Sequence, residues 1–329
     1  MKNNKGTIDI FKFLMALIVI EIHTQPFVNI SNSFFKNLLL LIEAIAVPYF
    51  FMASGYFLMD KCKKTSKKNW PNILIDFIKK MTKLYVIWTI IYLPLTLIYY
   101  INNVEPWYRD IVSFIRGFLF IGEQYNSWHL WYLLSAIYGS IVIYWGLLKK
   151  VNIKKIAIIG GIGLIMGFTT DIFITMDFVG LNAKIKSLIQ FIIPNGRIFE
   201  GLFYITMGMI FYKNNISFKT SITSIIISAI CFFIFPSSFF KDIMITVFSL
   251  SLFNIALYIK VNESAKYKIL RKTSTIMYFI HMYVWSIYYT IIYGEKTYSY
   301  DSFFATSIIS ILISLIYIKI KNNLKIKTS

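Results

Sequence analysis

The sequence predicts an all-α integral membrane protein, a bundle of about ten transmembrane helices with both the N-terminus and the C-terminus in the cytoplasm. Hydrophobic residues make up 57% of the 329 residues and charged residues 15%, against roughly 45–50% and about 25% in soluble domains. Apolar runs near the ~20 residues that cross a bilayer recur along the whole chain. Lipid must therefore cover apolar surface that one core cannot hold.

The apolar runs place the expected spans. They predict spans near residues 8–27, 37–59, 73–100, 129–148, 155–175, 197–212, 219–236, 240–260, 273–293 and 302–320. The two longest connections, 101–128 and 176–196, fall on the same side. Within the first connection, the apolar piece 111–121 is too short to cross and is expected in the interface or as a re-entrant segment. Residues 1–329 are interpreted as a single transmembrane domain.

The distribution of basic residues predicts the orientation. With the N-terminus inside, the inner segments hold 22 of the 34 Lys and Arg residues, whereas the outer segments hold eight, although they include the two longest loops. This asymmetry is typical of the positive-inside rule. The net charge of +19 is thus explained by orientation and by anionic lipid rather than by nucleic acid. The three scattered histidines lack carboxylates at ligand spacing, so no metal site is expected.

The first apolar run carries ionisable side chains at a depth where each costs several kcal/mol unless it is partnered or hydrated. Lys12 and His23 are eleven residues apart, which leaves them only about 20° apart around a helix axis and roughly 16 Å apart along it. Asp9 falls near the same face, whereas Glu21 points almost opposite and needs another partner. The alternative is structural: Lys12 reaches to the interface, and His23 caps a neighbouring backbone.

Five sequence segments carry a family resemblance. They are Ile8–Phe27 with Lys12 and His23, AIAVPYFFMASGYFL at 44–58, WHLWYL at 128–133, NGRIFEGLFYITMGM at 195–209 and STIMYFIH at 274–281. Their order and spacing resemble acyltransferase family 3, the membrane-bound O-acyltransferases that modify bacterial cell-surface glycans. Lys12 stands where that family usually has Arg, and it lacks the two-pronged geometry of a guanidinium. Met282 replaces a proline that often follows the histidine of the last segment.

The resemblance implies a reaction. An acyl group, expected to be acetyl, would pass from a cytoplasmic acyl-CoA such as acetyl-CoA to a hydroxyl of a cell-surface glycan or its precursor, in the bacterial cell membrane. His23 would be the general base or a transient acyl carrier, because imidazole exchanges protons near neutral pH. Lys12 would hold the phosphates of the donor. Glu43 would orient a histidine or pair with Lys12 or Arg197.

Four further residues are candidates for contact with the acceptor. Arg197, at the expected outer start of a span, would hold an anionic or sugar acceptor, or simply anchor the helix end. His129 is a candidate ligand, although its place between two tryptophans favours an aromatic belt residue. Tyr132 would donate to an oxyanion. His281 would line the cavity or hydrogen-bond across helices.

A second function class stays open. Within the family, the sequences of residues 23–27 and 47–58 are most similar to those of a subgroup that includes the membrane domains of vancomycin-resistance serine racemases. Those domains are linked to serine uptake, so the alternative is an uptake module for a small polar solute such as serine. A non-catalytic partner of a polysaccharide machine is a third, weaker hypothesis.

Overall fold

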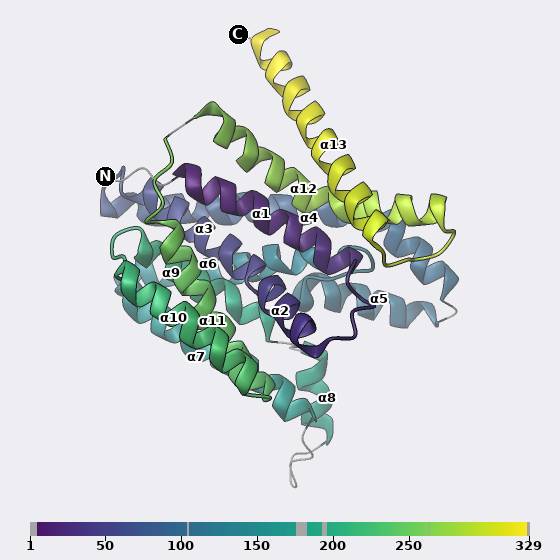
Figure 1. Ribbon diagram of the computed structural model, residues 1–329, viewed down its shortest axis with the longest axis horizontal. Coiled ribbons are helices and arrows are strands. Elements are labelled where there is room, and N and C mark those ends of the chain that lie inside the picture. Colours follow the sequence, from purple (N-terminus) through teal and green to yellow (C-terminus); the bar gives the residue numbers. More distant parts are fainter. Residues whose placement is uncertain (1–4, 104, 176–182, 193–195, 263, 328–329) are drawn as a thin grey trace. The chain divides into compact units, whose positions relative to one another are not determined.

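The structure, a computed structural model, describes residues 5–103, 105–175, 183–192, 196–262 and 264–327. All regular elements among these residues are helices (Figure 1), which confirms the expected all-α class. The chain divides into two compact units. The first comprises residues 1–50, 216–236 and 244–329, and the second comprises residues 51–215 and 237–243. Whether they act as one domain stays a prediction.

The first unit is built around three long helices. Helix α12 (Ala265–Ile292) packs against both α1 (Lys5–Thr24) and α13 (Tyr300–Lys327), and α1 also contacts α13. Helix α2 (Ser33–Ala44) contacts α1 and α10 (Phe218–Ile234). Helix α11 (Ser238–Ala256) contributes most of its length to this unit. Two of the candidate residues, His23 and His281, therefore lie on helices that pack against one another.

The second unit holds the remaining helices. Its packing is centred on α6 (Trp131–Leu148), which contacts α4 (Trp70–Asn102), α7 (Ile153–Thr175) and α9 (Glu200–Phe211). Helices α5 (Trp107–Arg116) and α8 (Ala183–Ile192) complete the longer elements, together with most of α3 (Ala46–Cys62), whose residues 46–50 belong to the first unit. Short helices are η1 (Lys67–Asn69), η2 (Gly117–Ile121), η3 (Trp128–Leu130) and η4 (Arg197–Phe199).

Every expected span coincides with a helix or a helix pair. Seven segments among the described residues are long and apolar enough to cross a membrane, and α10 is apolar but shorter. The expected helix 8–27 is present as α1, but its 20 residues include Lys5, Asp9, Lys12 and Glu21. Helix α9 has only 12 residues. The structure thus supports a multi-pass membrane protein, while the count of ten and the side of each terminus stay predictions.

The expected second span is broken into two helices. Helix α2 ends at Ala44 and α3 begins at Ala46, with Ile45 between them in a turn. Pro48 follows in the first turn of α3, and a proline has no backbone N–H to donate to the carbonyl of residue 44. The helix resumes with a bond from the Tyr49 N–H to the Ile45 carbonyl of 3.1 Å. Proline chemistry therefore explains the break.

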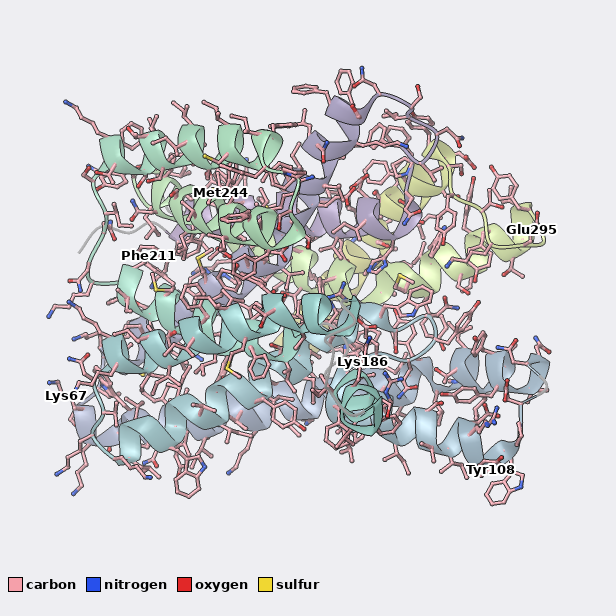
Figure 2. All side chains as sticks on the ribbon, turned by 90° about the horizontal axis from the view of Figure 1, so that it is seen from below. Lys67, Tyr108, Lys186, Phe211, Met244 and Glu295 are labelled. Atoms are coloured by element: carbon pink, nitrogen blue, oxygen red, sulfur yellow. The ribbon has the colours of Figure 1, made fainter. Side chains whose placement is uncertain are left out.

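The connection 101–128 contains a short amphipathic helix. The predicted piece 111–121 is divided between α5, of ten residues, and η2, of five residues, which follows it directly. Together they are shorter than the ~20 residues that cross a bilayer, which confirms that this segment is too short to span. In α5, Trp107 and Tyr108 are 74% and 53% exposed. The label Tyr108 in Figure 2 shows the position of this helix. Such exposed aromatic side chains are typical of a helix at the membrane interface. Part of the other long connection, 176–182 and 193–195, lies outside the described residues.

Candidate functional site

His23 and His281 form a pair in the first unit. Their ring centroids lie 5.2 Å apart with 32° between the planes, and they come from α1 and α12. His281 is fully buried. The sequence placed both residues among the candidates but did not predict that they meet. A pair of imidazoles at this distance can handle a proton from one substrate, because each ring can take or release one.

The orientation of the His281 ring follows from its hydrogen bond. Its Nδ1 lies 3.1 Å from the Met277 carbonyl oxygen, one turn earlier in α12. A carbonyl oxygen only accepts, so in this bond Nδ1 carries the hydrogen. In neutral His281 the lone pair is then on Nε2, which is the form of imidazole that can receive a proton.

Two aromatic rings join Lys12 to the histidine pair. The Lys12 Nζ lies 5.7 Å from the centroid of the Phe50 ring, within cation–π distance. The ring centroids of Phe50 and Tyr278 lie 5.4 Å apart, and those of Tyr278 and His281 lie 6.3 Å apart. Phe50 and Tyr278 are both buried. The first unit therefore contains a continuous run of contacts from the cation on α1 to the two histidines.

Glu43 interacts with Glu21. The two carboxyl groups, on α2 and α1, are neighbours that interact electrostatically. This supplies the partner that Glu21 was expected to need. The contact differs from the two partnerships suggested for Glu43, a histidine or one of the cations Lys12 and Arg197.

Asp9 pairs with Arg271 at the beginning of both helices. The Arg271 Nε and Nη2 donate to the two Asp9 carboxylate oxygens at 2.6 and 2.7 Å. The Asp9 side chain is 1% exposed, whereas that of Arg271 is 36% exposed. This two-pronged ion pair ties α1 to α12 one turn before Lys12.

In the second unit, Arg197 is bound to Glu123. The Arg197 Nη1 donates to the Glu123 carboxylate at 2.8 Å, and its guanidinium lies 5.2 Å from the Trp131 ring centroid. Burial raises the pKa of the Glu123 carboxyl above its ordinary value, while the charge and the hydrogen bond of Arg197 act in the opposite direction. Arg197 is thus a positioned cation with its side chain 45% exposed, available to a further anion or polar group.

A left-handed glycine precedes each member of this ion pair. Gly122 has φ = 80° and Gly196 has φ = 63°, a backbone region that other residues rarely adopt. A Cβ on Gly196 would come within 2.3 Å of the Gly167 Cα, and one on Gly122 within 2.5 Å of the Trp131 Cα. Backbone therefore packs against backbone at both positions, and this packing sets the places of Glu123 and Arg197.

Ser135 holds the helix start that carries Arg197. Its hydroxyl accepts from the Gly201 N–H at 2.9 Å and lies 2.9 Å from the Arg197 carbonyl, to which it donates. One side chain of α6 thus accepts from the Gly201 N–H, one of the first N–H groups of α9, which have no carbonyl partner within the helix. We regard Ser135 as a positioning residue for Arg197.

His129 and Tyr132 lie in the interior of the second unit. His129 is 2% exposed and packs edge-on against Tyr92, with 5.3 Å between ring centroids. This burial does not fit the belt residue that its sequence context favoured, because a belt side chain faces lipid and water. The Tyr132 hydroxyl is 2.9 Å from the Ser54 hydroxyl on α3, and its ring packs at 4.5 Å from Phe51.

The site therefore falls into two groups. Lys12, His23, Glu43 and His281 belong to the first unit, and Arg197, His129 and Tyr132 belong to the second. Sequence reasoning missed Phe50, Tyr278, Glu123 and Ser135. Phe50 and Tyr278 lie inside the quoted segments 44–58 and 274–281, so that signal was present. Among the described residues, no cluster of His, Cys, Asp and Glu is suited to a metal ion.

A multi-pass helical membrane protein with a histidine pair and positioned cations is the class that fold and site define. More particularly, the chain belongs to acyltransferase family 3, because residues 6–319 match its acyltransferase domain. This confirms the resemblance seen in the sequence, and it supports an acyltransferase enzyme. No solved structure matches the chain.

Several enterococcal proteins are similar to this chain. An amino-acid racemase of Enterococcus faecalis is 31% identical over 210 residues, 62% of this chain and 27% of that protein. A serine/alanine racemase of Enterococcus gallinarum is 31% identical over 153 residues, 46% of this chain and 21% of that protein. The match thus covers about a quarter of the length of these relatives, in line with the subgroup resemblance noted above.

Proposed function

We propose that this protein is a membrane O-acyltransferase that moves an acyl group, acetyl in the simplest case, from a cytoplasmic acyl-CoA to a hydroxyl of a cell-surface glycan or its precursor. The observation that carries the proposal is the run of contacts from Lys12 through Phe50 and Tyr278 to the pair His281 and His23. Membership of acyltransferase family 3 supports it. The bacterial cell membrane is the proposed location.

The histidine pair suits the chemistry of acyl transfer. His23 takes the proton of the acceptor hydroxyl as the oxygen forms a bond to the thioester carbonyl carbon. The carbon–sulfur bond then breaks, and the protonated imidazole returns its proton to the leaving thiolate, so that the histidine is regenerated. In this proposal His281, which has its lone pair on Nε2, either stabilises the protonated His23 or accepts the proton from it. The developing negative charge on the carbonyl oxygen needs a donor or a cation nearby.

The two cations have separate roles in this proposal. Lys12 meets a phosphate of the donor as a point charge, since a lysine lacks the fork of an arginine. Arg197, fixed by Glu123 and by the Trp131 ring, meets the acceptor. Glu43, bound to Glu21, keeps a carboxyl group close to α1 and so helps to position the helix that carries His23.

Kinetics of single variants test the division of roles. Lys12→Arg should retain activity, whereas Lys12→Met should raise the KM for the donor about tenfold or more, because charge-assisted bonds contribute roughly 1.5–3 kcal/mol. Lys36→Met, an exposed cation of α2, is the matched control and should leave KM unchanged. A loss of kcat without a change in donor KM in Lys12→Met would contradict the assignment.

The second candidate function is uptake of a small polar solute such as serine. It is favoured by one observation: relatives named amino-acid racemase and serine/alanine racemase share this membrane segment. In that function the face of α1 that carries Lys12 and His23 would line a solute path, and Lys12 would bind the carboxylate of the solute. An uptake protein has no need of a thioester, which separates the two candidates.

A further inference from the structure

Trp285 is a buried aromatic residue one turn after His281 in α12. Both side chains are 0% exposed. Four residues of an α-helix separate the two by about 6 Å along the axis and about 40° around it, so both lie on one face of α12. Side chains of a helix lean toward the turn before them, and for Trp285 that turn carries His281. Trp285 is therefore a close neighbour of the histidine pair.

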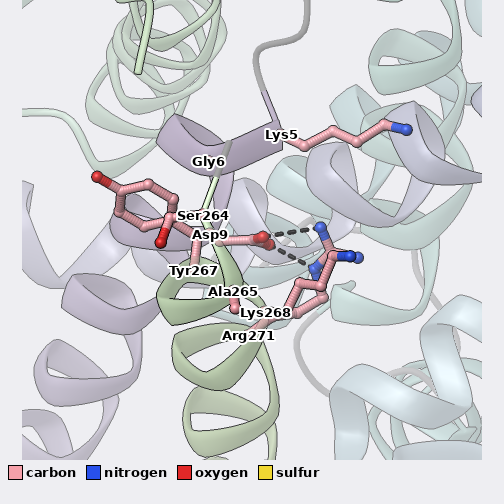
Figure 3. A pocket seen from close by; sticks show the side chains of 8 residues that line it. All are labelled: Lys5, Gly6, Asp9, Ser264, Ala265, Tyr267, Lys268 and Arg271. Atoms are coloured by element: carbon pink, nitrogen blue, oxygen red, sulfur yellow. Dashed lines mark hydrogen bonds and ion pairs between the residues drawn. The ribbon is translucent and has the colours of Figure 1, made fainter. Parts of the chain in front are cut away.

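The indole N–H of Trp285 is a buried donor. Among the described residues, its Nε1 has no hydrogen-bond partner. An indole nitrogen can only donate, and a buried donor without an acceptor destabilises the fold. By contrast, the buried Asp9 carboxylate, closer to the start of α12, accepts two bonds from Arg271 (Figure 3). The indole N–H of Trp285 therefore suits an acceptor oxygen that arrives with a ligand.

Three contacts hold the Trp285 ring in place. Tyr289 meets it edge-on with 5.2 Å between ring centroids, and the Tyr298 centroid lies 5.6 Å away. The Lys296 Nζ lies 5.2 Å from the centroid of the Trp285 ring, within cation–π distance. All four residues belong to the first unit. A fixed donor beside a cation stabilises developing negative charge, because neither group has to reorganise when that charge appears.

The chemistry of acyl transfer decides which oxygen this N–H can serve. As the acceptor oxygen bonds to the carbonyl carbon, His23 takes the hydroxyl proton and one electron pair of the C=O bond moves onto the carbonyl oxygen. When the carbon–sulfur bond breaks, that pair re-forms the C=O bond, and the leaving thiolate takes the proton from His23. A hydrogen bond to the acceptor oxygen would engage the lone pair that attacks. The carbonyl oxygen instead gains charge in the transition state, so it gains most from a donor.

We propose that the indole N–H of Trp285 donates a hydrogen bond to the carbonyl oxygen of the acyl group, which makes Trp285 a catalytic residue beside the histidine pair. Because it involves the thioester carbonyl, this role rests on the proposed acyltransferase function. Lys296 keeps a positive charge against the same ring.

Kinetics of the full chain in lipid test this role, with acetyl-CoA as donor and methyl glucoside as hydroxyl acceptor. Trp285→Phe keeps an aromatic ring and removes the N–H, so kcat should fall about 10²–10³-fold, with little change in either KM. Benzothienylalanine at the same position keeps the shape of the indole with sulfur in place of the N–H. It should show the same loss, which separates the missing donor from a packing defect.

Trp70→Phe is the matched control. Trp70 is also buried, its Nε1 has no hydrogen-bond partner among the described residues, and the Lys63 Nζ lies 5.4 Å from the centroid of its ring. It belongs to the second unit, and its turn of α4 carries none of the candidate catalytic residues. Trp70→Phe should therefore keep the kcat of the unchanged protein.

A second measurement does not depend on turnover. The ketone analogue of acetyl-CoA that has a methylene in place of the thioester sulfur keeps the carbonyl oxygen and transfers no acyl group. In the NMR spectrum of the indole N–H groups, the resonance that is lost in Trp285→Phe should move downfield when this analogue binds.

Three results would overturn the role of Trp285 and leave the proposed function in place. They are an unchanged kcat in both variants at position 285, a rise in acceptor KM with kcat unchanged, and binding of the ketone analogue without movement of that resonance. No binding of acetyl-CoA or of the analogue to the unchanged protein would overturn the proposed function, and the role of Trp285 with it.

Discussion

His23 and His281 meet with 5.2 Å between their ring centroids, although α1 and α12 lie near opposite ends of the chain. We propose that both residues act as one proton-handling group. We expect His23→Ala to lower kcat by about 10²–10⁴-fold, the usual contribution of a general base. His281→Ala should cost less, and the double variant should be no worse than His23→Ala, since residues that act as a unit are not additive. Steady-state release of coenzyme A measures this. Losses that multiply in the double variant would show that the rings act independently.

The Asp9–Arg271 pair predicts an asymmetry in stability. Arg271→Ala leaves a carboxylate that is 1% exposed without its main partner, which should lower the free energy of unfolding by about 3–5 kcal/mol. Asp9→Ala should cost clearly less, because the Arg271 side chain is 36% exposed and can turn to water. Chemical denaturation of both variants and of the double variant checks the order. A double variant whose cost equals the sum of the two single costs would mean that the ion pair is not the origin of either effect.

The backbone contact at Gly196 predicts a functional loss without a change in any charge. Gly196→Ala must move either Gly167 or the start of α9, because its Cβ would lie 2.3 Å from the Gly167 Cα. The KM for the acceptor should rise as Arg197 shifts, with the donor KM unchanged. Gly161→Ala on α7 is the control, since a Cβ there meets its nearest neighbour at an ordinary 3.5 Å. A matching change in acceptor KM in both variants would exclude the positioning role.

The Glu123 carboxyl predicts a pH dependence of stability. Burial raises its pKa in the folded protein above the ordinary value, so between the two values the folded state holds more protons than the unfolded state. Stability is then highest below about pH 4.3, the unfolded value, and falls as the pH rises through the folded pKa. The unfolding midpoint of the unchanged protein minus that of Glu123→Gln should therefore decrease as the pH rises over that range. An increase of this difference with pH would contradict a raised pKa of Glu123 in the folded protein.

Much of the fold could be read from hydropathy, because lipid imposes long apolar runs, and each predicted span is a helix. The break at Ile45 was not predicted, although Pro48 signals it. The site was predicted less completely. Lys12 and His23 stand out because a charge at depth is rare, whereas Phe50 and Tyr278 are ordinary apolar residues in an apolar chain. Pairings such as Glu123 with Arg197 depend on which loops meet, and periodicity along one helix carries no information on that.

The central claim is that the histidine pair moves the proton during transfer of an acyl group from a thioester to a hydroxyl. The most direct measurement is release of free coenzyme A by the purified protein in lipid, supplied with acetyl-CoA and a hydroxyl acceptor, and compared with His23→Ala. We predict binding of acetyl-CoA to both proteins and acceptor-dependent release by the unchanged protein alone, because proton removal stabilises the transition state rather than the bound donor. The contrary result is no binding of acyl-CoA, together with accumulation of labelled serine in vesicles that persists in His23→Ala.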